Sequence, residues 1–132
     1  MLKSVPDLER SGHLSLVQAD AQRLPLRDET ADVGLAMHML YHVPDMQAAV
    51  RELRRIVKPG GTELASTVSP SSMGEMRELQ DAAASALLGR SVRVLPPLSF
   101  TTETGTAVLA TEFSDVALLR HEGALSFPRW KR

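Results

Sequence analysis

Residues 33–68 read VGLAMHMLYHVPDMQAAVRELRRIVKPGGTELASTV, and this stretch decides the fold. The apolar run at 33–37 predicts a buried strand, and residues 64–68 predict a second strand. Between them, residues 46–57 carry apolar side chains at the spacing that lines one face of an α-helix. Strand, helix and strand in this order predict a βαβ crossover, in which the two strands lie parallel and the helix covers one face of the sheet.

Both ends of this helix are marked in the sequence. Asp45 is a good amino-terminal cap, because its carboxylate can accept hydrogen bonds from the free N–H groups of the first turn. Pro59-Gly60-Gly61 should stop the helix and turn the chain into the next strand. Upstream, residues 14–19 predict a short strand, and Leu24-Pro25-Leu26 predicts an extended loop segment.

The carboxyl-terminal half predicts two helices and a hairpin. Residues 73–88 predict a helix that Ser72 and Glu75 open in capping-box spacing and Gly89 closes. A shorter helix should begin at Thr101 or Thr102 and end near Phe113. Strands at 116–121 and 124–127, joined by Glu122-Gly123, then predict an antiparallel hairpin.

Composition narrows the class of protein. With 132 residues, 43% of them hydrophobic, the chain predicts a single globular domain over 1–132, and the absence of cysteine excludes disulfides, thiolate zinc sites and iron–sulfur clusters. Fifteen basic residues against 16 acidic ones give a net charge of −1, which argues against a nucleic-acid partner. No apolar run approaches the roughly 20 residues that cross a membrane, and no secretory signal opens the chain, so we expect a cytoplasmic protein.

Candidate site residues follow the predicted strands, because parallel sheets bind ligands outside the carboxyl ends of their strands. Asp20 and Ala21 follow the first strand, and His38, Tyr41 and His42 follow the second. Asp20 could instead only end its strand through an Asx turn. His42 could act as a general base, or it could be a partly buried histidine with a satisfied hydrogen bond.

Other chemistries lack their motifs. His38 and His42 stand four residues apart and could share a zinc ion on a helix, but a third ligand is missing and Pro44-Asp45 indicates a loop, so we expect no metal. The sequence contains neither G-x-G-x-x-G nor G-x-x-x-x-G-K, and no serine lies in a G-x-S-x-G elbow. Dinucleotide oxidoreductases, nucleotide hydrolases and serine hydrolases are therefore disfavoured.

The order of five short motifs resembles the class I S-adenosylmethionine-dependent methyltransferases, and most of all the type 11 group that includes ubiquinone and menaquinone C-methyltransferases. The motifs are VQADA at 17–21, LPL at 24–26, the acidic segment 28–32, HMLYH at 38–42, and REL with KPGG between 51 and 61. Residues 100–127 resemble the last helix and hairpin of this fold more loosely. The resemblance implies an α/β fold with a Rossmann-like sheet of parallel strands and an antiparallel carboxyl-terminal hairpin.

The resemblance also implies roles for individual residues. Asp20 would accept a hydrogen bond from the adenine amino group of S-adenosylmethionine, the Ala21 amide would meet a ring nitrogen, and Leu24 would pack nearby. His38 would lie beside the methionine portion of the cofactor. Tyr41 and His42 would face a small-molecule methyl acceptor, with His42 as the candidate catalytic base. Residues 69–98 would form the variable segment that covers the substrate.

The family's glycine-rich loop and the acidic residue after its second strand have no counterpart here, so the resemblance implies a partial domain that is truncated at its amino end and lacks the first two strands of the sheet. The family's strand order would place those strands between 14–19 and 33–37. The two remaining strands would then pair directly, or exposed edges would favour homo-oligomers or strand exchange. An alternative function is a non-catalytic remnant that acts as an interaction module. A start codon upstream of Met1 is a further possibility.

Overall fold

The computed structural model describes residues 14–123 and divides the chain into two compact units at Ser66 and Thr67, each of which is described by itself. The first unit contains β1 (Ala31–Met37), a 3-10 helix η1 (Leu40–His42), α2 (Met46–Ile56) and β2 (Val57–Ser66). The second unit contains α3 (Gly74–Leu88) and α4 (Gly105–Leu109).

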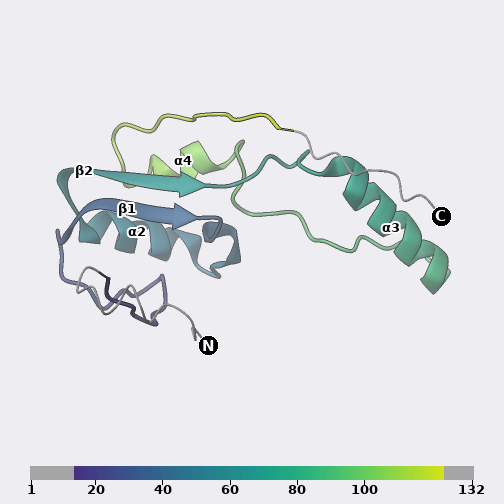
Figure 1. The fold of residues 1–132 in the computed structure, drawn as a ribbon, viewed down its shortest axis with the longest axis horizontal. Helices are drawn as coiled ribbons and strands as arrows, with labels where there is room; N and C mark the ends of the chain where they lie inside the picture. Colours follow the sequence, from purple (N-terminus) through teal and green to yellow (C-terminus); the bar gives the residue numbers. More distant parts are fainter. Residues whose placement is uncertain (1–13, 124–132) are drawn as a thin grey trace. The chain divides into compact units, whose positions relative to one another are not determined.

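The first unit is the predicted βαβ crossover. β1 and β2 pair in parallel, from Val33 opposite Thr62 to Met37 opposite Ser66, and α2 covers one face of this two-stranded sheet (Figure 1). The apolar stripe of α2 is buried as its periodicity predicted. The core of the unit consists of Ala36, Leu40, Ala49, Val50, Leu53, Ile56 and Val57.

The opposite face of the sheet is open. Four apolar side chains on this face, which is the face away from α2, are between 50% and 64% exposed: Val33, Leu35, Met37 and Leu64.

On the α2 side, Glu63 lies opposite Gly34, and a Cβ atom at Gly34 would collide with its carboxylate. Neither oxygen of Glu63 has a hydrogen-bond partner, and desolvation raises the pKa of this carboxyl to about 7. The nearby Ala36 backbone N–H lowers the pKa by a smaller amount without completing a hydrogen bond.

The prediction that Pro59-Gly60-Gly61 stops the helix and turns the chain into the next strand was wrong. The helix already ends at Ile56, and the segment lies inside β2, which begins at Val57 rather than at 64. Ala31 pairs with Val57 but Val33 pairs with Thr62, so the extra residues of β2 form a bulge. The left-handed φ of +77° at Gly60 allows the bulge. Lys58 pairs with Asp32 at 2.7 Å beside it.

Residues 14–19 form no strand, so this prediction was wrong. All six are exposed, and the only bridge nearby is the turn pair of Asp20 with Arg23. A strand needs a partner for its backbone N–H and C=O groups, and β1 and β2 are the only paired strands among residues 14–123. Direct pairing of 14–19 with β1 therefore does not occur in the described structure.

The structure contains both helices predicted for the second unit, but the predicted start of α3 was wrong. α3 begins after Met73, which has a φ of +55° and makes no side-chain cap, so the predicted Ser72–Glu75 capping box does not form. Gly89 closes α3 in the left-handed conformation, as predicted. No residue of α3 is buried, so its apolar stripe is not a core face within the described residues.

α4 is shorter than the helix predicted from Thr101 to Phe113, because Thr101 and Thr104 bond each other in a preceding turn. Residues 116–121 adopt no strand, and their predicted partner at 124–127 lies outside the described residues. The described part of the chain thus gives no support to an antiparallel hairpin. Within residues 14–123, no helix is both long and apolar enough to span a membrane.

Candidate functional site

The turn at residues 20–23 presents an ionised carboxylate. Oδ1 of Asp20 accepts a hydrogen bond from the backbone N–H of Gln22 at 2.9 Å, which is the predicted Asx turn. The side-chain amide of Gln22 donates to both oxygens, at 3.0 Å and 3.1 Å. These bonds, the backbone one foremost, hold the pKa of Asp20 below its usual value, so the group is negative at neutral pH.

The same turn keeps both a donor and an acceptor available. Asp20 is exposed, and its Oδ2 accepts only the one bond from Gln22. Among residues 14–123, the Ala21 backbone N–H has no hydrogen-bond partner. A carboxylate next to a free N–H can bind a ring edge that carries an amino group beside a ring nitrogen, which is the pattern of adenine. These are the two groups that the resemblance assigns to adenine binding.

Three aromatic rings lie together after β1. The Tyr41 ring meets His42 edge to face at 4.5 Å between centroids and His38 at 6.4 Å. Leu40, which is fully buried, anchors the 3-10 helix η1 that carries Tyr41 and His42. The structure thus gathers the three residues that the sequence singled out, with both histidines exposed to ligands.

His38 has a strained backbone. Its φ of +50° lies in the left-handed region, which costs a residue with a side chain about 1 kcal/mol or more. Its N–H is held by Ser66 on β2, whose hydroxyl accepts at 3.0 Å and whose carbonyl accepts at 3.2 Å. This bond across the carboxyl ends of the two strands fixes the point where the His38 side chain leaves the sheet.

No three His, Asp or Glu side chains among residues 14–123 come close enough to hold an ion. His38 and His42 do not share a helical face either, because β1 ends before His38 and η1 begins after it.

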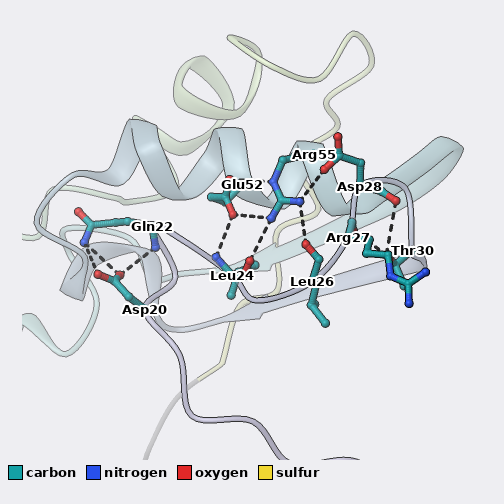
Figure 2. A network of polar contacts seen from close by, with 9 residues as sticks. All are labelled: Asp20, Gln22, Leu24, Leu26, Arg27, Asp28, Thr30, Glu52 and Arg55. Carbon is teal, nitrogen blue, oxygen red and sulfur yellow. Dashed lines mark hydrogen bonds and ion pairs between the residues drawn. The ribbon is translucent and has the colours of Figure 1, made fainter.

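Two charged residues of α2 clamp the loop that contains Leu24 (Figure 2). Arg55 binds Glu52 through two bonds, at 2.9 Å and 2.7 Å, and also binds Asp28 and the carbonyl oxygens of Leu24 and Leu26. Glu52 in turn accepts the Leu24 N–H at 2.9 Å. The bonds from Arg55 lower the pKa of Glu52 to about 2 and raise that of Arg55, so both stay charged. The clamp fixes the backbone of the loop four residues after Asp20.

Gln22, Glu52, Arg55 and Ser66 received no role from the sequence. Glu52 and Arg55 did carry a signal, since opposite charges three residues apart on the polar face of a helix bond each other readily. Ser66 carried none, because its partner His38 lies 28 residues away in the chain. The bond of Gln22 with Asp45 spans 23 residues and carried none either, whereas its bonds with Asp20 span only two.

The second unit contains a cavity of its own. Its volume of about 630 Å³ lies within the range of small-molecule sites. Side chains and backbone of α3 and of residues 93–104 form its walls, among them Arg77, Asp81, Arg93, Leu95, Leu98 and Glu103. Eleven of the 14 residues that line this cavity lie within 69–98, the segment expected to cover a substrate.

Residues 1–65 match a protein-family model that is described as a methyltransferase domain. Over 51 residues the chain is 37% identical to a sterol 4-C-methyltransferase of Caenorhabditis elegans, covering 39% of this chain and 15% of that protein. Over 56 residues it is 45% identical to the ubiquinone/menaquinone biosynthesis C-methyltransferase UbiE of Caulobacter vibrioides, covering 41% of this chain and 22% of that protein. The chain therefore spans less than a third of the curated relatives it matches.

A solved structure has a similar fold. A methyltransferase of Thermotoga maritima, described as a possible histamine N-methyltransferase, superposes with a TM-score of 0.57 at 23% identity. The superposition covers 80% of this chain and 48% of the other. At this identity the match shows the fold alone.

Proposed function

Because residues 1–65 match the model of a methyltransferase domain, we propose that this chain binds S-adenosylmethionine through Asp20 and Ala21 and takes part in methyl transfer to a small-molecule acceptor. The donor–acceptor pair at the turn carries this proposal. The Asp20 carboxylate accepts from the adenine amino group, and the free Ala21 N–H donates to the adjacent ring nitrogen. Leu24, held by Glu52, packs beside the ring.

The aromatic cluster supports the other end of the site. His38, with its backbone fixed by Ser66, lies beside the methionine portion of the cofactor, and Tyr41 and His42 face the acceptor. The sulfonium methyl group is already electrophilic, so the residues mainly align the acceptor and exclude water. Where the acceptor must lose a proton, His42 is the base, because its exposed imidazole can accept a proton from an acceptor beside it.

The cavity in the second unit, taken by itself, is a candidate site for a small molecule. Its apolar side chains, Leu95 and Leu98, can cover a hydrocarbon group, and Arg77 and Arg93 can meet anionic groups. Residues 69–98, the variable segment that the resemblance implies, would then set which molecule this cavity takes.

Titration with S-adenosylhomocysteine, the product of methyl transfer, tests the proposal. Asp20→Asn should weaken binding about 5- to 150-fold, since losing a hydrogen bond to a charged acceptor costs roughly 1–3 kcal/mol. Asp115→Asn, which changes an exposed carboxylate of the second unit, is the matched control and should bind like the wild type. Calorimetry that detects no binding to the wild-type chain, or equal binding by Asp20→Asn, would disprove the adenine site.

A further inference from the structure

Gln22 joins two parts of the first unit that are distant in the sequence. Its side-chain nitrogen donates to both carboxylate oxygens of Asp20, and its side-chain oxygen accepts the backbone N–H of Asp45 at 2.9 Å. Asp45 is the cap of α2, since its own Oδ1 accepts from the Ala48 N–H at 2.9 Å. A chain of hydrogen bonds thus runs from Asp20 through Gln22 to the first turn of α2.

Only a glutamine amide in one orientation can make both bonds. Carboxylate oxygens of an ionised aspartate accept and cannot donate, so the NH₂ group must face Asp20. A backbone N–H donates and cannot accept, so the amide oxygen must face Asp45. A glutamate at this position would keep the second bond and lose the first, and an alanine would lose both. This difference allows the two halves of the bridge to be separated by mutation.

We propose that Gln22 is a positioning residue that holds the Asp20 carboxylate in its ligand-binding orientation and ties it to the start of α2. The role in binding rests on the proposed function. Without the bridge, only the backbone N–H of residue 22 would hold the Asp20 carboxylate, so the side chain would be less ordered and ligand binding would have to order it at a cost in free energy. The loop of His38, Tyr41 and His42 leads directly into Asp45, so the bridge also connects the adenine end of the site to the segment that carries the aromatic cluster.

Three variants of the full chain test this role: Gln22→Ala, Gln22→Glu and, as the matched control, Gln18→Ala, which changes an exposed glutamine of the same unit. Carbon-13 NMR of the Asp20 carboxyl during a pH titration reports its pKa without any ligand. Hydrogen exchange of the Asp45 amide reports the second bond, and calorimetry with S-adenosylhomocysteine reports binding.

The expected results differ between the variants. Gln22→Ala should raise the pKa of Asp20 toward its ordinary value, speed exchange of the Asp45 amide and weaken binding roughly 2- to 10-fold. Gln22→Glu should raise the Asp20 pKa further, because it places a like charge beside the carboxylate, and should weaken binding at least as much. It should nevertheless keep the Asp45 amide protected. Gln18→Ala should change none of the three readouts.

Two outcomes would overturn the inference. An Asp20 pKa that does not move in Gln22→Ala would show that the amide does not hold the carboxylate. Binding restored by Gln22→Glu would show that Gln22 acts only through Asp45. If the Asp20 pKa moves as expected but the wild type binds no S-adenosylhomocysteine, the hold of Gln22 on Asp20 is supported and the proposed function is disproved.

Discussion

Arg55→Lys is the sharpest test of the clamp between α2 and the loop of residues 24–28. The guanidinium has five N–H donors, and all five are used: two bind Glu52, one binds Asp28, and two bind the carbonyl oxygens of Leu24 and Leu26. A lysine keeps the positive charge, but its ammonium has only three donors and no planar fork. The substitution therefore removes hydrogen-bond donors and their planar arrangement, and it keeps the positive charge.

The structure sets the size of the effect. At least two of the five bonds must be lost, and each contributes about 0.5–1.5 kcal/mol net, which gives a loss of about 1–3 kcal/mol. The share from Asp28 is small, because its side chain is 75% exposed and water screens the pair. Most of the loss comes from Glu52, which is only 18% exposed and cannot exchange both bonds for water easily.

Hydrogen exchange measures this loss where it occurs. The Leu24 N–H binds Glu52, and the Glu29 and Thr30 N–H groups bind the carbonyl oxygens of Arg55 and Ile56. Exchange of these three amides should become about 5- to 150-fold faster in Arg55→Lys. Arg51→Lys, which alters an exposed arginine of the same helix, should leave them unchanged. Equal exchange rates in the two variants would refute the clamp.

Three further predictions concern stability. The pKa of the Glu63 carboxyl is about 7 in the folded chain and 4.5 ordinarily. As pH rises between these values, the unfolded chain loses this proton before the folded chain does, so the free energy of unfolding falls. Urea titrations at pH 5 and pH 8 should show this fall in the wild type and not in Glu63→Val. Asp45→Ala should cost about 0.5–2 kcal/mol in thermal unfolding because the Ala48 N–H loses its acceptor, whereas Asp45→Asn keeps the cap. Gly61→Ala should cost about 1–3 kcal/mol in urea, since its Cβ would lie 2.7 Å from a backbone carbonyl oxygen, while Gly74→Ala meets open space and should be tolerated.

Local rules predicted the crossover and the candidate aromatic cluster. The periodicity of residues 46–57, the cap at Asp45 and the apolar run of β1 all depend on neighbours within a few residues, and the helix and strand formed as expected. The same rules failed for residues 14–19 and 116–121. Those segments have strand composition, but a strand exists only where another segment completes its backbone hydrogen bonds.

The Pro59-Gly60-Gly61 segment shows a second kind of failure. Proline and glycine do break helices, but here the helix had already ended at Ile56, and pairing with β1 drew the segment into β2 as a bulge. Local propensity correctly predicted that these residues do not continue a helix, but it did not predict that they belong to β2.

The sequence by itself determined the βαβ unit, its parallel strands and the residues at their carboxyl ends. Only the tertiary structure decided what holds those residues in place, because the bonds of Gln22 with Asp45, Ser66 with His38 and Arg55 with Leu24 join groups 23, 28 and 31 positions apart. Helix and strand patterns repeat over two to four residues and can be read from the chain. A hydrogen bond across a fold has no such period, so it is defined only when packing has brought its donor and acceptor together.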